Sequence, residues 1–121
     1  MTEVLDLQAE LAELRTQEPW TRSGRHAKTL LKDAELRVVL IALQTGARLA
    51  EHHAPGRITI HTLSGHLTIR VQERTIELPA GQILTIARAM PHDVEAREES
   101  AFLLTIAWPA GTSGAAPVEE G

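Results

Sequence analysis

Short apolar segments recur at regular spacing from about residue 27 onward, and this pattern constrains the fold more than any other feature of the sequence. Glycine and proline residues separate the segments. Many short strands with turn residues between them are typical of antiparallel sandwiches and barrels. We therefore expect an all-β fold. The expected strands cover residues 27–31, 36–43, 49–53, 58–63, 66–71, 75–78, 83–86, 91–96 and 101–107.

The two ends of the chain depart from this pattern. Residues 3–15 carry leucines near helical spacing, and Thr2 or Asp6 could cap a short N-terminal helix. Pro19 is expected to end this helix region, since the residue before a proline avoids helical conformation. Residues 109–121 are rich in Pro, Gly and Ala and are expected to be a disordered tail. The expected organisation is a helix and connection over 1–24, a barrel over 25–108 and a tail over 109–121.

Residues 36–43 form the strongest apolar segment, which only Arg37 interrupts. A strand that is apolar on both faces must be covered on both faces. One possible cover is a second copy of the chain, in the twofold homodimer that is the commonest oligomer. The other is the expected helix over residues 3–15. We expect a homodimer, and the helix is the alternative.

Composition excludes several classes of function. A chain of 121 residues fits one domain, and its net charge of −4 with few aromatic residues argues against a nucleic-acid surface. The absence of cysteine excludes disulfides, thiolate metal sites and a cysteine nucleophile. No apolar run approaches about 20 residues, and the N-terminus lacks a basic signal-peptide start. We expect a cytoplasmic protein that binds neither nucleic acid nor membrane.

Histidines occur at two places that the expected strands could bring together. His52 and His53 stand between a strand segment and the turn Pro55-Gly56. His92 follows Pro91 about forty residues later. Imidazole is a common ligand of transition metals and a common acid–base group. We therefore expect the chain to fold so that these two places meet.

These residues resemble the two motifs of the cupin family. Gly46, followed after five residues by His52, matches the opening of the first motif, and the alignment continues to Gly65. Gly81, with His92 eleven residues later, matches the second motif. The resemblance covers roughly residues 27–107 and is closest to small single-domain cupins, a largely uncharacterised subgroup. It implies a double-stranded β-helix, which is a jelly-roll barrel.

The chain also departs from both motifs. Ala54 replaces the second histidine of the first motif, and Ile58 replaces its glutamate. Ala87, Ala89 and Ala96 replace the proline, glycine and asparagine of the second motif. The resemblance therefore implies two of the four usual metal ligands, His52 and His92.

A further ligand would have to come from another histidine. Successive side chains of a strand point to opposite faces, so His53 faces out if His52 faces in. His61 likewise faces out if Ile58 faces in, unless a bulge inverts the strand locally. His61 is nevertheless the first candidate, because it lies in the strand that supplies the motif's glutamate, and His53 is the second. The expected cofactor is a divalent transition metal: Fe, Mn, Ni, Cu or Zn.

Apolar residues of the barrel with one or two histidines suit a small, mostly apolar ligand. Arg57 could reach the barrel mouth and bind an anionic substrate, or it could be a solvated turn residue. Asp93 and Glu95 should face out, and His26 and His66 should be solvated. The expected pocket-lining residues are Ala54, Ile58, Ile60, Ile83, Met90, Phe102 and Leu104.

Two functions follow from this combination. The first is a small cupin that binds a divalent transition metal, a small molecule or both, with a metal-dependent oxygenase or isomerase as its enzymatic form. The alternative is a metal-free cupin module that binds or senses a small molecule without catalysis. The sequence identifies no catalytic residue and no substrate.

Overall fold

The computed structural model describes residues 3–52, 56–88 and 90–107, without the side chains of residues 51 and 52. This part of the chain forms two short helices followed by nine strands. The helices are α1 (Leu7–Leu14) and α2 (Glu18–Ser23). The strands are β1 (Arg25–Lys32), β2 (Leu36–Leu43), β3 (Arg48–His52), β4 (Arg57–Ser64), β5 (His66–Val71), β6 (Arg74–Pro79), β7 (Ile83–Ile86), β8 (His92–Ala96) and β9 (Ser100–Ala107).

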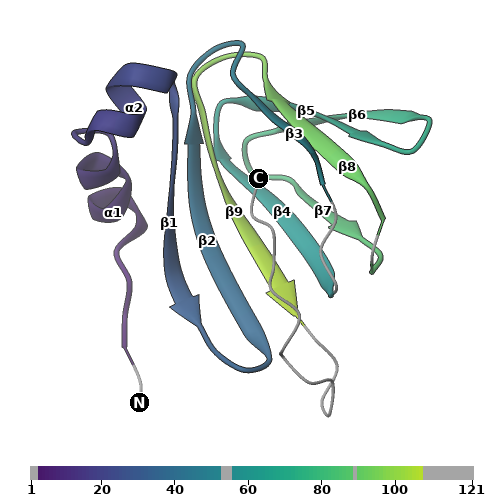
Figure 1. Ribbon diagram of the computed structural model, residues 1–121, viewed down its shortest axis with the longest axis horizontal. Coiled ribbons are helices and arrows are strands. Elements are labelled where there is room, and N and C mark those ends of the chain that lie inside the picture. The colour runs from purple at the N-terminus through teal and green to yellow at the C-terminus, as the bar shows by residue number, and fades with distance from the viewer. Residues whose placement is uncertain (1–2, 53–55, 89, 108–121) are drawn as a thin grey trace.

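The strands form two antiparallel sheets that face each other (Figure 1). One sheet has five strands in the order β1-β2-β9-β4-β7, and the other has four in the order β3-β8-β5-β6. Strands that are distant in sequence are therefore neighbours in space, as β2 and β9 are. This arrangement confirms the expected all-β jelly-roll fold.

The main core fills the space between the two sheets. Strand alternation places every second side chain inward: Val39, Ile41 and Leu43 on β2, for example, are all buried in it. Phe102 of β9 is the largest fully buried side chain. The other strands contribute mainly Ile, Leu and Val, so the barrel interior is largely hydrocarbon.

A second, smaller core lies on the outer side of the five-stranded sheet. Leu14 of α1 and Trp20 of α2 pack there with Leu40 and Ala42 of β2. Figure 1 shows both helices beside β1, at one end of this sheet. The Asp6 side chain accepts a hydrogen bond from the backbone of Ala9 at 3.2 Å and so caps α1.

The helix α2 corrects the expectation of an irregular connection before the barrel. Pro19 was expected to stop helical structure, but it stands in the first turn of α2. Proline is tolerated there because the first backbone N–H groups of a helix have no intrahelical partner. The helix α1 ends earlier, at Leu14, and α2 begins at Glu18.

The packing of α1 and α2 on β2 bears on the expected homodimer. The outer side of β2 was the reason to expect a second copy of the chain, and α1 and α2 bury that side within one chain. The oligomeric state itself stays a prediction. In the described part of the chain, no helix is long and apolar enough to cross a membrane.

Gly65, between β4 and β5, is one of the residues that the fold requires for steric reasons. Its φ angle is +83°, and a Cβ atom placed on it would lie 2.3 Å from the carbonyl oxygen of Glu99. The backbone of the next residue, His66, donates a hydrogen bond to the Ser100 hydroxyl at 2.9 Å. A side chain at this position would force β9 away from the β4–β5 turn.

If α1 covers the sheet as described, Leu14→Ala will destabilise the protein by about 2–5 kcal/mol, the usual cost of emptying a buried leucine site. Leu14 is 1% exposed. Urea unfolding measures the change. Leu5→Ala is the matched control, because Leu5 is 36% exposed and lies before the helix. Equal and small effects of both substitutions would contradict the role given to α1.

Candidate functional site

The two histidine stretches meet at one end of the four-stranded sheet. Strand β3 ends at His52 and β8 begins at His92, and the strand register pairs these two residues. On the other side of β8, His92 pairs with Val71, the last residue of β5. The structure therefore brings positions 52 and 92 together, as the sequence predicts. His53 and the side chain of His52 lie outside the described residues.

His92 points into the barrel. On β8, His92, Val94 and Ala96 are buried and alternate with Asp93 and Glu95. The imidazole is 2% exposed, and its Nδ1 lies 3.2 Å from the carbonyl oxygen of Met90. Because a carbonyl can only accept a hydrogen bond, this contact assigns the proton to Nδ1 in the neutral ring. A short loop contact thus orients the buried imidazole.

A cavity of about 320 Å³ lies beside His92, at the same end of the barrel. Its wall includes Val71, the strand partner of His92, and Met90, whose carbonyl oxygen accepts the hydrogen bond from the imidazole. His92 itself is not among the described residues that line the cavity. The lining comes from the start of β4, the β5–β6 turn and the end of β7: Arg57, Val71, Gln72, Arg74, Ile76, Leu84, Thr85, Ile86, Ala87 and Met90.

The lining differs from the one expected from the sequence. Met90 lines the cavity, whereas Ile58, Ile60, Phe102 and Leu104 are buried deeper, in the core between the sheets. Ala54 lies outside the described residues.

Ile83 corrects an expectation, because it is 58% exposed on β7 and faces away from the core. Its strand neighbours Leu84 and Ile86 line the cavity instead. Strand alternation counted back from Ile86 would have selected Leu84. Arg74 was missed altogether, since nothing in a turn sequence shows which cavity it will border.

His61 is also corrected as a metal ligand. On β4, the buried residues Ile58, Ile60 and Thr62 alternate with the half-buried Thr59 and His61. The register with β7 runs without interruption from Ile58 to His61, so no bulge turns His61 inward. His61 therefore lies on the outer side of the five-stranded sheet, and the structure does not bring it to His92.

The described side chains do not complete the usual four-ligand metal site of the family, of which the resemblance implies two ligands. Among the described residues, no three or more His, Asp or Glu side chains gather in a way that could hold a metal ion. The position of the motif's glutamate holds Ile58, whose hydrocarbon side chain is buried in the core. Of the two ligands that the resemblance implies, His92 is the one whose side chain the structure describes, and position 52 is its strand partner.

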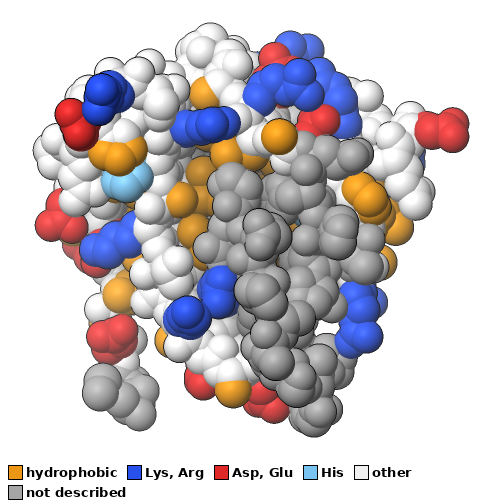
Figure 2. All heavy atoms as spheres, in the orientation of Figure 1, with side chains coloured by type: hydrophobic (Ala, Val, Ile, Leu, Met, Phe, Trp, Pro, Cys, Tyr) orange, Lys and Arg blue, Asp and Glu red, His pale blue; other side chains and the backbone are white. Residues whose placement is uncertain are grey.

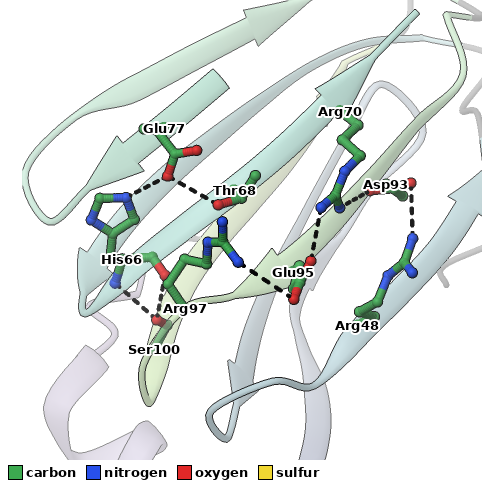
Figure 3. Close-up of polar contacts among 9 residues, drawn as sticks. All are labelled: Arg48, His66, Thr68, Arg70, Glu77, Asp93, Glu95, Arg97 and Ser100. Carbon is green, nitrogen blue, oxygen red and sulfur yellow. Dashed lines mark hydrogen bonds and ion pairs between the residues drawn. The ribbon is translucent and has the colours of Figure 1, made fainter. Parts of the chain in front are cut away.

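The outer face of the four-stranded sheet carries a ladder of ion pairs (Figure 3). Arg70 on β5 contacts Asp93 at 3.2 Å and Glu95 at 3.0 Å, and both carboxylates belong to β8. Arg48 on β3 contacts Asp93 from the other side at 3.3 Å. Asp93 and Glu95 face outward as expected, but the arginines cover them, and the Asp93 side chain is only 15% exposed. The ladder ties together the strands that carry His92 and Val71.

His26 and His66, which were expected to be solvated, are half-buried and have polar partners. His26 Nε2 lies 2.6 Å from the side-chain oxygen of Gln17. His66 Nε2 lies 2.7 Å from Glu77 Oε1, and Thr68 donates a hydrogen bond to the same oxygen at 3.0 Å. The contacts with His66 and, next, with Thr68 lower the pKa of Glu77 below its ordinary value.

Comparisons with known proteins agree with this fold. The family model described as a cupin domain matches residues 39–108. No curated protein matches the chain. A conserved protein of unknown function from Streptococcus pyogenes has a TM-score of 0.73 at 23% identity, over 92% of this chain and 91% of that chain.

Two other similar structures come from named proteins. KdgF from Halomonas sp. has a TM-score of 0.64 at 17% identity, over 69% of this chain and 80% of that chain. The cupin domain of an XRE family transcriptional regulator from Enterobacter cloacae has a TM-score of 0.63 at 22% identity, over 71% of this chain and 98% of that domain. At these identities the similarity shows the fold alone.

The lowered pKa of Glu77 predicts a pH-dependent stability. A carboxylate whose pKa is lower in the folded than in the unfolded state stabilises above its unfolded pKa, and this stabilisation is lost as the pH falls through the folded pKa. Glu77→Gln should therefore lower the melting temperature at pH 7, and the difference from wild type should shrink below about pH 4.5. Thermal melts between pH 3 and pH 7 measure this. Glu73→Gln, in the exposed β5–β6 turn, is the control; a Glu77→Gln effect that does not vary with pH would contradict the assignment.

Proposed function

Because the chain belongs to the cupin family, we propose that it is a small-molecule-binding cupin protein whose ligand occupies the cavity between β4, β7 and the β5–β6 turn. The observation that carries this proposal is the cavity itself, of about 320 Å³, next to the buried His92. This volume is at the lower end of the range found for small-molecule sites, which begins near 300 Å³. The proposed ligand is accordingly small.

The chemistry of the wall supports a ligand with an apolar body. Val71, Ile76, Leu84, Ile86 and Met90 present hydrocarbon and thioether surface to the cavity. A few polar groups at the edge would orient the ligand, which is the usual composition of a small-molecule site. The cupin domain of a transcriptional regulator shares the fold, which is consistent with binding or sensing as the role of such a barrel.

A metal at positions 52 and 92 is the second candidate, and the strand pairing of the two histidines is the observation that favours it. A bound metal would act as a Lewis acid toward an oxygen atom of the ligand, as in an oxygenase or isomerase. With His61 on the outer face, two protein ligands would leave most of the coordination to solvent or ligand. We therefore place metal-independent binding first.

Ligand binding in the cavity can be tested by obstructing it. Thermal-shift screening of small organic molecules should identify compounds that raise the melting temperature of the wild-type protein. Thr85→Trp should abolish these shifts, because Thr85 lines the cavity and is itself exposed, so that the larger side chain can be accommodated. Ile83→Trp is the matched control: it is exposed on the same strand, two residues away, and does not line the cavity. Shifts that survive Thr85→Trp would place binding elsewhere.

Elemental analysis decides between the two candidates. Untagged wild-type protein, His52→Ala and His92→Ala are analysed side by side after incubation with divalent transition metals. We expect less than stoichiometric metal in all three, and ligand-induced thermal shifts that chelator treatment leaves unchanged. Near-stoichiometric metal in the wild type that is lost in both variants would instead establish the metal site at positions 52 and 92.

A further inference from the structure

We infer that the cavity selects small organic acids, and that Arg57 and Arg74 hold the carboxylate of the ligand. This inference rests on the proposed function, because it names the class of molecule that the same cavity would take. Its basis is the contrast between these two arginines and most of the other arginines of the chain, together with their placement around the cavity.

Most of the arginines have partners within the protein. Arg48 and Arg70 belong to the ion-pair ladder, and Arg97 contacts its Glu95. Arg15 and Arg22 each contact another glutamate. Within the described residues, the side chains of Arg57 and Arg74 form no ion pair and no hydrogen bond. Both nevertheless line the cavity. Their guanidinium groups are therefore available to a bound molecule.

The two arginines approach the cavity from different sheets. Arg57 is the first residue of β4, in the five-stranded sheet, and Arg74 is the first residue of β6, in the four-stranded sheet. A guanidinium presents parallel N–H donors that match the two oxygens of a carboxylate. Two such groups at one cavity can bind one anionic head group, while Val71, Ile76 and Leu84 contact the apolar body of the ligand.

The charge around this end of the barrel agrees with an anionic ligand. The chain as a whole has a net charge of −4, yet no carboxylate is among the described residues that line the cavity. The nearest acidic residue in sequence, Glu73, stands in the exposed β5–β6 turn. Arg88, which is exposed and follows the lining residue Ala87, adds positive charge beside the cavity. The cavity is thus a locally basic site on an acidic protein.

Figure 2 shows a face of the molecule on which Lys and Arg side chains lie near hydrophobic side chains. Positive charge at an apolar cavity would attract organic anions by long-range electrostatics. The attraction weakens as ionic strength rises, because the distance over which exposed charges interact shrinks from about 10 Å at 0.1 M salt to about 3 Å at 1 M. Binding of the proposed ligands should therefore be salt-dependent.

The test compares acids with their neutral counterparts. Butanoate, hexanoate, benzoate and phenylacetate are each paired with the corresponding primary amide, and binding is measured by calorimetry or ligand-observed NMR at low and high NaCl. The compounds of each pair have nearly the same shape, so their difference reports the charge. We expect at least one acid to bind about tenfold more tightly than its amide, with the preference reduced at high salt.

Variants then assign the preference to the two arginines. Arg57→Gln and Arg74→Gln should each weaken binding of the acid about tenfold and leave binding of the amide nearly unchanged. Both residues are exposed, so both variants should fold, and a thermal melt verifies this. Arg22→Gln, on α2 and away from the cavity lining, is the control and should behave as wild type.

The outcomes separate this inference from the proposed function. If neutral compounds bind in the cavity as well as the acids do, the cavity is a ligand site but the selection for anions is wrong. If acids bind equally well to both glutamine variants, the assignment to Arg57 and Arg74 is wrong. If none of the acids binds, but the general thermal-shift screen finds ligands whose shifts Thr85→Trp abolishes, the inference fails and the proposed function stands. If nothing binds in either experiment, both fail.

Discussion

The structure depends most on the pairing of the last strand, β9, with both β2 and β4. The register aligns Ala107 with Leu36 on one side and with Arg57 on the other. This pairing joins segments that are distant in the sequence and brings the starts of β2 and β4 to one end of the barrel. The contact is so close at Gly56 that a Cβ atom there would lie 2.1 Å from the carbonyl oxygen of Ala107. The position of Arg57 beside the cavity therefore follows from a backbone constraint rather than from any contact of its own side chain.

The four-stranded sheet uses the two-residue period of its strands to separate two kinds of chemistry. On β8, the inward positions hold His92 and apolar residues, and the outward positions hold Asp93 and Glu95. The outward carboxylates are matched by Arg48 and Arg70, and the mutual neutralisation lets this face stay charged without a large local field. The arginines at the cavity, Arg57 and Arg74, have no such carboxylate partner among the described residues. A charged sheet face and a basic cavity can thus occur on one acidic chain.

The sequence predicted the parts of this structure that depend on local periodicity. The strands at 36–43, 66–71 and 83–86 lie where apolar segments and turn residues placed them. The pairing of positions 52 and 92 agrees with the resemblance to the two cupin motifs. Three features needed the folded structure. Pro19 could equally end one helix or begin another. The face of Ile83 depends on the register of an edge strand that is only four residues long. Arg74 lines the cavity because the β5–β6 turn lies near the end of β7, and no local sequence pattern shows this proximity. Strand alternation did indicate the outward face of His61, which was a candidate ligand because it lies in the strand that supplies the motif's glutamate.

The departures from the cupin motifs and the arginines at the cavity fit one chemical explanation under our proposal. An anionic ligand in a largely apolar cavity needs a compensating positive charge, because an unpaired carboxylate is costly to remove from water. In a site with a full set of metal donors, the metal ion would supply that charge. Here Ile58 occupies the position of the motif's glutamate with a buried hydrocarbon side chain, and the residue immediately before it is Arg57. The Arg57 guanidinium, next to the isoleucine that replaces the glutamate, supplies positive charge without a metal. The missing metal ligands and the basic cavity would then both follow from one difference: the barrel binds its anionic ligand through arginines in place of a metal ion.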